Sequence, residues 1–239
     1  MVAVCPRISA VLFDVGGTLV YEPDVDGWVE QARLLNFIVD PVAFAQAYVG
    51  VLTEVDEGTA PRDAEESVVE FWRRVIARTV GKDVSSTAAT KFVVACGEKS
   101  APVRLHPDAR GCLDQLRDDR RALGVISNST SEEVVRMVLH RADILDYFDC
   151  IVSSGTEGVA KPDPEIFLRA VRWLGVLPAE ALYVGDKALT DAVAAQAAGL
   201  HGVWVNREAL EHGPNPPEIS SLLEIPVYVR HIEQGLPTV

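Results

Sequence analysis

Short apolar runs that alternate with helical patterns constrain the fold of this 239-residue chain more than any other feature. The runs span residues 8–13, 122–126, 150–152, 181–184 and 202–205. Runs of this length without charged residues are typical of strands buried on both faces. The patterns between the later runs predict helices over residues 107–117, 132–139, 164–174 and 191–198. The alternation predicts an α/β fold whose core is a Rossmann-like parallel sheet with helices on both faces.

Residues 28–96 carry helical patterns and no convincing strand. Periodic apolar residues predict four helices, over residues 28–39, 44–52, 64–80 and 87–96. We interpret the aromatic residues of this stretch, including Trp28 and Trp72, as the core of a helical bundle, since periodic apolar residues normally mark a buried face. The sequence therefore predicts an all-helical domain over residues 21–100, inserted into a core domain of residues 1–20 and 101–239.

The C-terminal part gives weaker signals. Proline-rich residues 208–217 predict a surface loop, and Ser220, Leu222 and Leu223 are compatible with a last short helix. An edge strand is expected at residues 227–229, where three residues of high strand propensity follow one another.

The composition narrows the choice of partners and compartment. A net charge of −13 argues against nucleic acid or an anionic membrane as a partner. Four separated cysteines without a C-x-x-C pattern indicate free thiols of a reducing compartment. No signal peptide or membrane span is evident, so a cytoplasmic protein is expected, either a monomer or a homodimer.

Polar residues follow the ends of the predicted strands. They are Asp14, Ser127 with Asn128, a loop carrying Lys161, and Asp186 with Asp191 five residues later. Parallel strands place such residues at one edge of the sheet. Carboxylates that meet there repel one another unless a cation joins them, and Mg²⁺ prefers oxygen ligands. The set suits a phosphate group presented to a carboxylate nucleophile beside a metal ion.

Each of these residues also has a simpler interpretation. Asp14 and Ser127 could be helix caps, Lys161 a surface charge, and Asp186 and Asp191 turn or helix-start residues. No one of these interpretations explains the whole set. The glycines at positions 16 and 17 indicate that the backbone turns tightly after Asp14 or approaches another group closely there.

Four motifs stand in order at these strand ends and loops. They are residues 14–18 (DVGGT), Ser127-Asn128, residues 158–164 (GVAKPDP), and residues 184–186 (VGD) followed by Asp191. The set resembles the haloacid dehalogenase superfamily of hydrolases, on its phosphatase side. The resemblance covers residues 8–20 and about 102–205, and the helical region lies where these proteins carry a helical cap domain.

The resemblance implies roles for individual residues, on a small phosphorylated metabolite as substrate. The implied catalytic residues are Asp14, which would form an aspartyl-phosphate, and Lys161, which would neutralise charge. The implied phosphate-binding residues are Ser127, Asn128, Lys161 and Thr18. The implied ligands of Mg²⁺ are Asp14, the carbonyl group of Gly16, Asp186 and Asp191.

The sequence departs from the pattern at Gly16. Most phosphatases of this superfamily carry there a second Asp, which protonates the leaving group, and losing such a group typically costs about 10²–10⁴ in rate. The first hypothesis is a hydrolase that uses another proton donor or a good leaving group such as an acyl phosphate. The candidate donors near the predicted domain boundary are Glu22, Asp24, Asp26 and His106.

Two alternatives remain open. The second hypothesis is a non-catalytic or regulatory module that binds Mg²⁺ and phosphate. The third, less favoured, is phosphonatase or dehalogenase chemistry. Phosphonatases of the superfamily form an imine with a lysine of the cap. The helical region carries lysines only late in its sequence, at Lys82, Lys91 and Lys99. The Gly185-Asp186 pair argues against a dehalogenase.

Overall fold

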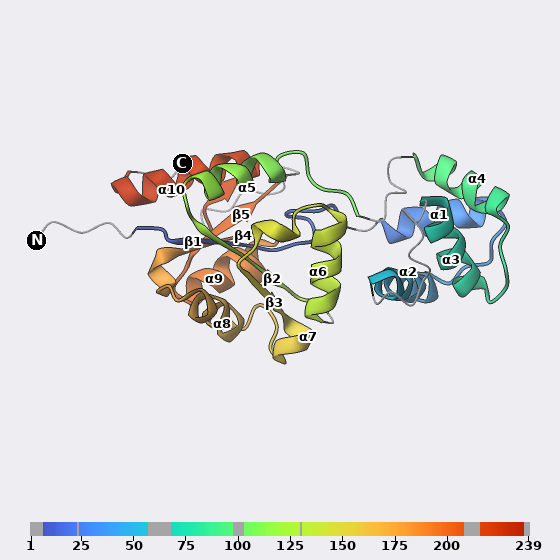
Figure 1. Ribbon diagram of the computed structural model, residues 1–239, viewed down its shortest axis with the longest axis horizontal. Helices are drawn as coiled ribbons and strands as arrows, with labels where there is room; N and C mark the ends of the chain where they lie inside the picture. Colours follow the sequence, from blue (N-terminus) through green and yellow to red (C-terminus); the bar gives the residue numbers. More distant parts are fainter. Residues whose placement is uncertain are drawn as a thin grey trace, which may run out of the picture. The chain divides into compact units, whose positions relative to one another are not determined.

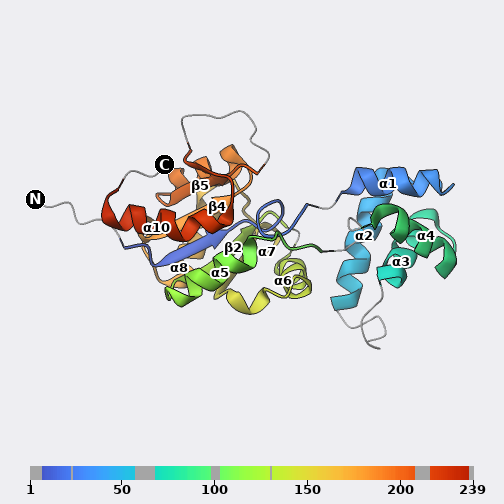
Figure 2. The same ribbon diagram turned by 90° about the horizontal axis from the view of Figure 1, so that it is seen from above.

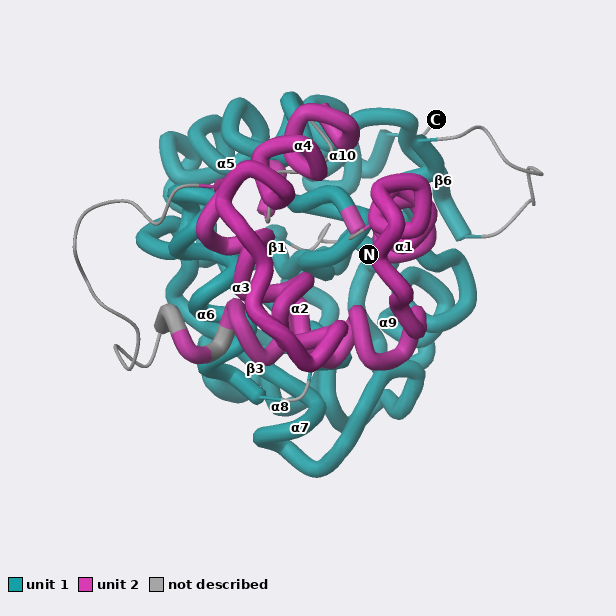
Figure 3. Tube along the Cα trace, turned by 90° about the vertical axis from the view of Figure 1, so that its right-hand side faces the viewer, with its two compact units in different colours: residues 1–21, 105–239 teal, residues 22–104 magenta. Residues whose placement is uncertain are grey.

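The structure, a computed structural model, describes residues 7–22, 24–56, 68–97, 103–129, 131–207 and 216–236. The chain divides into two compact units (Figure 3). One comprises residues 1–21 and 105–239 and is called the core unit below. The other comprises residues 22–104 and is called the helical unit.

The core unit is built on a six-stranded parallel sheet with the strand order β3-β2-β1-β4-β5-β6. The strands are β1 (Ala10–Phe13), β2 (Ala122–Ser127), β3 (Cys150–Ser153), β4 (Ala181–Gly185), β5 (His201–Val205) and β6 (Glu218–Ile219). All four residues of β1 are buried, because β1 lies between β2 and β4 at the centre of the sheet. The predicted parallel sheet is confirmed. The two-residue β6 is too short to have left an apolar run in the sequence.

Helices cover both faces of the sheet, as predicted. On one face, α5 (Ala109–Asp118) lies beside α10 (Ile225–Gln234), and on the other, α8 (Pro164–Leu174) lies beside α9 (Ala194–Ala197) (Figures 1 and 2). Two more helices, α6 (Glu132–Arg141) and the short α7 (Ser154–Glu157), contact β3. The core beneath α8 and α9 combines alternate side chains of the strands, such as Leu12 and Tyr183, with Phe167 of α8.

Two details of the core unit differ from the sequence-based expectation. The strand predicted at residues 227–229 is wrong, because these residues belong to α10. Ile225, Tyr228 and Val229 are buried at helical spacing, Pro226 stands in the first turn, and Gly235 ends the helix in the left-handed conformation. The helix predicted from Asp191 begins instead as a π-helical stretch, Ala188–Val193, that leads into α9.

The helical unit contains α1 (Val25–Leu34), α2 (Pro41–Asp56), α3 (Val68–Val80) and α4 (Ser86–Cys96). The helical insertion after the first strand is therefore confirmed, although residues 64–67 of the predicted third helix lie outside the described residues. Trp72 is completely buried, and its ring centroid lies 4.6 Å from that of Trp28. Phe44, Tyr48 and Phe92 surround it. The tryptophans thus form the bundle core.

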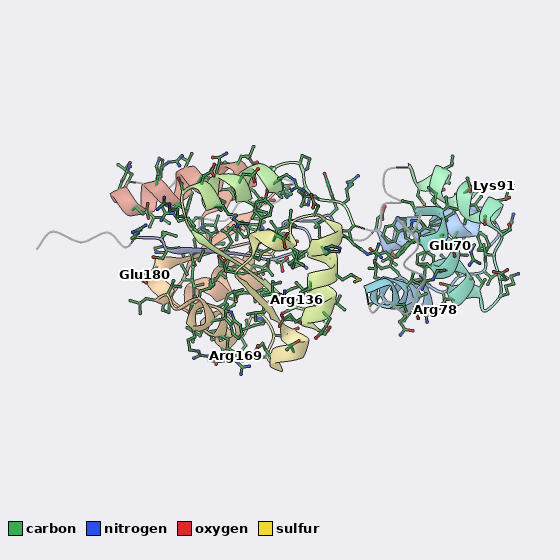
Figure 4. The ribbon with its side chains drawn as sticks, viewed as in Figure 1. Glu70, Arg78, Lys91, Arg136, Arg169 and Glu180 are labelled. Atoms are coloured by element: carbon green, nitrogen blue, oxygen red, sulfur yellow. The ribbon has the colours of Figure 1, made fainter. Side chains whose placement is uncertain are left out.

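Charged side chains such as Glu70 in the helical unit and Arg169 in the core unit (Figure 4) form ion pairs. Arg73 pairs with Glu70 at 2.8 Å in the helical unit, and Arg169 pairs with Glu157 at 2.6 Å in the core unit. Such partly exposed pairs contribute only about 0–1 kcal/mol each. Among the described residues, no helix combines the length and apolar character that crossing a membrane requires.

Candidate active site

Three strand ends meet at the centre of the sheet. Ser127 ends β2, Asp14 follows β1 directly, and Asp186 follows β4 directly. The backbone N–H of Asp14 donates to the carbonyl of Val184 at 2.8 Å, which continues the pairing of β1 with β4. Because β1 lies between β2 and β4 and is parallel to both, the three residues emerge at the same edge of the sheet. This edge is where open α/β sheets bind ligands.

The carboxylates of Asp14, Asp186 and Asp191 form a cluster. Each offers one oxygen, and these oxygens lie within 4.8 Å of one another. Asp14 and Asp191 are buried, and Asp186 is half-buried. A cluster of carboxylate oxygens is the donor set that a hard divalent cation prefers, so these residues fit a Mg²⁺ ion.

Two glycines lie so close to this cluster that a side chain at either position would collide with a carboxylate. Gly17 has a φ of +74°, and a Cβ atom there would lie 2.3 Å from Oδ2 of Asp186. A Cβ atom on Gly185 would lie 2.3 Å from Cγ of Asp191. Both separations are far below van der Waals contact. The close backbone approach that the glycines after Asp14 predicted is confirmed at Gly17.

Lys161 lies buried among these carboxylates. Its Nζ donates to Oδ1 of Asp14 at 2.5 Å, to Oδ1 of Asp191 at 2.7 Å and to the hydroxyl of Tyr183 at 2.9 Å. An ammonium group has three N–H donors, so all of them are used. Burial alone lowers the pKa of Lys161, but Asp14 and Asp191 outweigh it, and the pKa is raised above its ordinary value.

The nucleophile predicted from the sequence is itself perturbed. Burial, with a further contribution from the charge of Asp191, raises the pKa of Asp14 above its ordinary value, although Lys161 opposes the shift. One ammonium group faces three carboxylates in this cluster. A divalent cation would supply the positive charge that the cluster lacks.

The predicted phosphate-binding residues are placed differently from one another. The Ser127 side chain makes no hydrogen bond to any described residue and is half-buried at the strand end, so its hydroxyl is available to a ligand. Both polar groups of the Asn128 side chain bind the main chain of Lys161, at 2.9 Å each. We therefore interpret Asn128 as a residue that positions Lys161, which the sequence did not reveal.

Thr18 and Gly16 lie in the turn after β1. The Thr18 hydroxyl is buried and has no hydrogen-bond partner among the described residues, while its carbonyl accepts a bond from Arg207 at 2.8 Å. Gly16 forms an isolated bridge with Val20. Its φ is not positive, in contrast to that of Gly17, so a side chain at this position would not have to adopt the left-handed conformation.

The family can be read from sequence as well as from this geometry. The haloacid dehalogenase-like hydrolase model matches residues 8–199, which is most of the chain. The chain belongs to the haloacid dehalogenase-like hydrolases. It is 33% identical over 211 residues to a glyceraldehyde 3-phosphate phosphatase from Methanopyrus kandleri, covering 84% of each chain. It is 30% identical over 245 residues to the N-acylneuraminate-9-phosphatase of Rattus norvegicus, covering 95% of this chain and 96% of the relative.

A solved structure of the same family has a similar fold. The phosphatase from Thermococcus onnurineus superposes with a TM-score of 0.56 at 25% identity, covering 97% of this chain and 100% of its own. The curated relatives named above are phosphatases, and this haloacid dehalogenase-like hydrolase aligns with them across both of its compact units.

The candidate proton donors of this haloacid dehalogenase-like hydrolase fall into both units. Glu22, Asp24 and Asp26 belong to the helical unit, where Asp24 caps α1 by accepting the N–H of Gly27 at 3.1 Å. His106 belongs to the core unit. It is buried, its ring centroid lies 3.8 Å from that of Tyr21, and its backbone N–H donates to the carbonyl of Leu19 at 2.9 Å.

One residue of the site was missed by the sequence analysis. Tyr183 stands inside the apolar run that predicts β4, and its hydroxyl contacts Lys161 and Asp191. The available signal was chemical, because a buried tyrosine usually finds a hydrogen-bond partner. Periodicity alone assigns such a residue to the core.

Proposed function

We propose that this hydrolase is a Mg²⁺-dependent phosphatase that uses Asp14 as its nucleophile on a small phosphorylated metabolite. The observation that carries the proposal is the buried Lys161, held between Asp14 and Asp191 at 2.5 Å and 2.7 Å. A lysine in this position orients one carboxylate and neutralises charge without leaving the site. The activities named for the relatives, on glyceraldehyde 3-phosphate and on N-acylneuraminate 9-phosphate, support a phosphorylated metabolite as substrate.

The chemistry has two displacements. A carboxylate oxygen of Asp14 attacks phosphorus, and the bond between phosphorus and the leaving oxygen breaks, with the electron pair going to that oxygen. Water then attacks the phosphorus of the aspartyl-phosphate, and the bond between phosphorus and the Asp14 oxygen breaks with its electron pair going to that oxygen. One proton of the water stays on the new P–OH group and the other passes to a phosphate oxygen, so dihydrogen phosphate leaves and the Asp14 carboxylate is restored. Lys161 holds Oδ1 of Asp14 throughout, and the free hydroxyl of Ser127 can donate to an oxygen of the phosphoryl group.

The cation would be held by Asp14, Asp186, Asp191 and the carbonyl group of Gly16. When bound, Mg²⁺ supplies positive charge against the oxygens of the phosphate group. The fit rests on the cluster of three carboxylates, whose oxygens lie within 4.8 Å of one another.

Gly16 favours substrates whose leaving group departs without a proton. An acyl phosphate has such a leaving group, because the carboxylate it releases is a weak base. A sugar phosphate needs a donor in place of the missing acid, with Glu22, Asp24, Asp26 and His106 as the candidates.

The test measures phosphate release in the presence of Mg²⁺ from a panel of phosphomonoesters and acyl phosphates. Asp14→Asn keeps the size of the side chain and sets the background. We expect wild type to exceed this variant by a factor on the order of 10³, with acyl phosphates turned over fastest. Equal rates of wild type and Asp14→Asn on the whole panel would overturn the proposal.

Gly16 also favours a second candidate function, a module that binds Mg²⁺ and phosphate without turnover. Gly16→Asp separates the two, since the backbone of Gly16 does not require a positive φ. An inert wild type together with an active Gly16→Asp variant would favour the binding module. A wild type that is already faster than the variant would exclude it.

Phosphonatase and dehalogenase chemistry can be tested beside these assays. Borohydride trapping of an imine with the substrate would support a phosphonatase. Release of chloride from 2-chloropropionate without Mg²⁺ would support a dehalogenase.

A further inference from the structure

Tyr183 combines an apolar ring position with a polar contact that the proposed mechanism has not used. The residue is completely buried in β4, and its ring packs edge-on against Phe167 of α8 with centroids 4.9 Å apart. Its hydroxyl lies 2.9 Å from Nζ of Lys161, 3.1 Å from Oδ1 of Asp191 and 3.3 Å from the carbonyl of Ile126. The strand and the helix fix the ring, and the hydroxyl points at the site.

The direction of these hydrogen bonds follows from the number of protons. Lys161 has only donors, so the Tyr183 hydroxyl accepts from it and keeps one proton to donate. Asp191 receives that proton at 3.1 Å, a shorter distance than the 3.3 Å to Ile126. Tyr183 therefore bridges the lysine and a carboxylate of the cluster.

The contact with Tyr183 matters because Lys161 has no fourth acceptor in the described part of the chain to replace it: each of its three N–H donors already binds one acceptor. Its other two donors go to Asp14 and Asp191, and its side chain has four flexible bonds. The rigid phenol is the only neutral partner of the ammonium group among the described residues. Without the hydroxyl, one N–H of a buried ammonium group would lose its acceptor, and Lys161 would reorient.

We propose that Tyr183 is a positioning residue. Its hydroxyl holds Lys161 against Asp14, and it also holds Asp191 in the orientation in which this carboxylate would bind the metal ion. The inference rests on the proposed function for the role of Asp14 and Lys161. It adds a residue from the hydrophobic core to the site, and it predicts effects on both turnover and metal affinity. A purely structural tyrosine would affect neither.

The experiment compares Tyr183→Phe with wild type and with Tyr147→Phe. Tyr147→Phe also removes a hydroxyl, one that donates to Asp114 at 2.5 Å on the surface, away from the site. For Tyr183→Phe we expect kcat to fall about 10- to 100-fold with KM changed less than about threefold, because misplaced groups cost turnover more than ground-state binding. We expect half-saturation by Mg²⁺ to rise about 10-fold, the size of effect seen when a partner of a metal ligand is removed. Tyr147→Phe should match wild type in both.

The outcomes separate this inference from the proposed function. Turnover by wild type with unchanged kcat, KM and Mg²⁺ dependence in Tyr183→Phe overturns the inference and leaves the phosphatase intact. A lower melting temperature as the sole effect also overturns it, because Tyr183 would then be structural. If wild type shows no turnover, the proposed phosphatase activity is overturned. Titration of Mg²⁺ by calorimetry still tests the inference in that case, because equal affinities in wild type and Tyr183→Phe would overturn it.

Discussion

The side chain of Asn128 holds the peptide groups of Lys161 by two hydrogen bonds, each 2.9 Å long. Its Nδ2 donates to the carbonyl of Lys161, and its Oδ1 accepts the N–H of Lys161. The contact joins the end of β2 to the loop that carries the lysine. The main chain of Lys161 is therefore fixed by Asn128, while its ammonium group is fixed by Asp14, Asp191 and Tyr183.

Removing this contact should lower turnover without removing any charged group. We expect Asn128→Ala to reduce kcat about 10- to 100-fold, because the loop loses both bonds and Lys161 is displaced from Asp14. Steady-state phosphate release measures the change. Asn206→Ala is the control, since Asn206 contacts Glu218 in the core unit. An Asn128→Ala variant as active as this control would show that Lys161 is positioned by its ammonium contacts alone.

Replacing the lysine should be more severe. Lys161→Met keeps most of the side-chain volume but leaves Asp14 and Asp191 buried without their cation. We expect phosphate release to fall to the level of Asp14→Asn, by a factor on the order of 10³. Circular dichroism checks that the variant is folded. Turnover within about tenfold of wild type would contradict the role given to Lys161.

The two glycines after Asp14 should respond differently to the same change. A methyl group at Gly17 would lie 2.3 Å from Oδ2 of Asp186 and would require a positive φ, so Gly17→Ala should displace that carboxylate. We expect about 10-fold weaker Mg²⁺ binding in Gly17→Ala than in Gly16→Ala, measured by calorimetry. Similar affinities in the two variants would mean that Asp186 does not contribute to the metal site.

The cation should also be detectable as added stability. A ligand at about 100 times its Kd stabilises the folded state by about 2.7 kcal/mol if it does not bind the unfolded chain. We therefore expect Mg²⁺ to raise the melting temperature of EDTA-treated wild type, and EDTA to abolish phosphate release. Asp186→Asn should show a much smaller rise. A melting temperature that does not change when Mg²⁺ is added would refute the metal site.

Asp108 should make the core unit sensitive to acid. Burial alone raises the pKa of Asp108, but hydrogen bonds from Arg207, Leu222 and Ser221 outweigh it and hold the pKa below its ordinary value. A depressed carboxyl pKa stabilises the fold above the pKa of the unfolded chain, near 3.8, and this stability is lost as the pH falls below it. Asp108→Asn should lower the free energy of unfolding at pH 7 by about 2 kcal/mol and by less at pH 3. Urea unfolding at the two pH values measures the difference, and equal losses at both would contradict the assignment.

Five of the six strands, and the sheet edge at which the charged candidate residues gather, could be predicted from the sequence for physical reasons. Runs such as residues 181–184 are buried on both faces and must be apolar, and a carboxylate directly after such a run, as at Asp186, has no packing role. Parallel pairing then fixes which strand ends are neighbours. Asp14, Lys161 and Asp191 could be brought together on this basis alone.

The finer contacts could not be predicted, because they depend on direction. Asn128 follows a strand end like a ligand-binding residue, and nothing in the sequence says that its amide faces the peptide of Lys161. Tyr183 looks like a core residue because its ring is buried in the core. Only its position along β4 brings the hydroxyl to Lys161. Residues 227–229 were misjudged because three successive residues fit both a strand and one turn of a helix.

The central place of β1 has a consequence for how the protein is made. β1 precedes the other strands of the sheet in the chain, but it pairs with β2 on one side and β4 on the other. Asp14 and Lys161 are separated by 147 residues, so the contact between them depends on long-range chain closure. A nascent chain that has not reached Asp191 carries Asp14, the proposed nucleophile, without its complete surroundings. The cluster of Asp14, Lys161 and Asp191 can therefore form only after four of the six strands of the sheet have been synthesised, and the proposed phosphate release would report that these strands have come together.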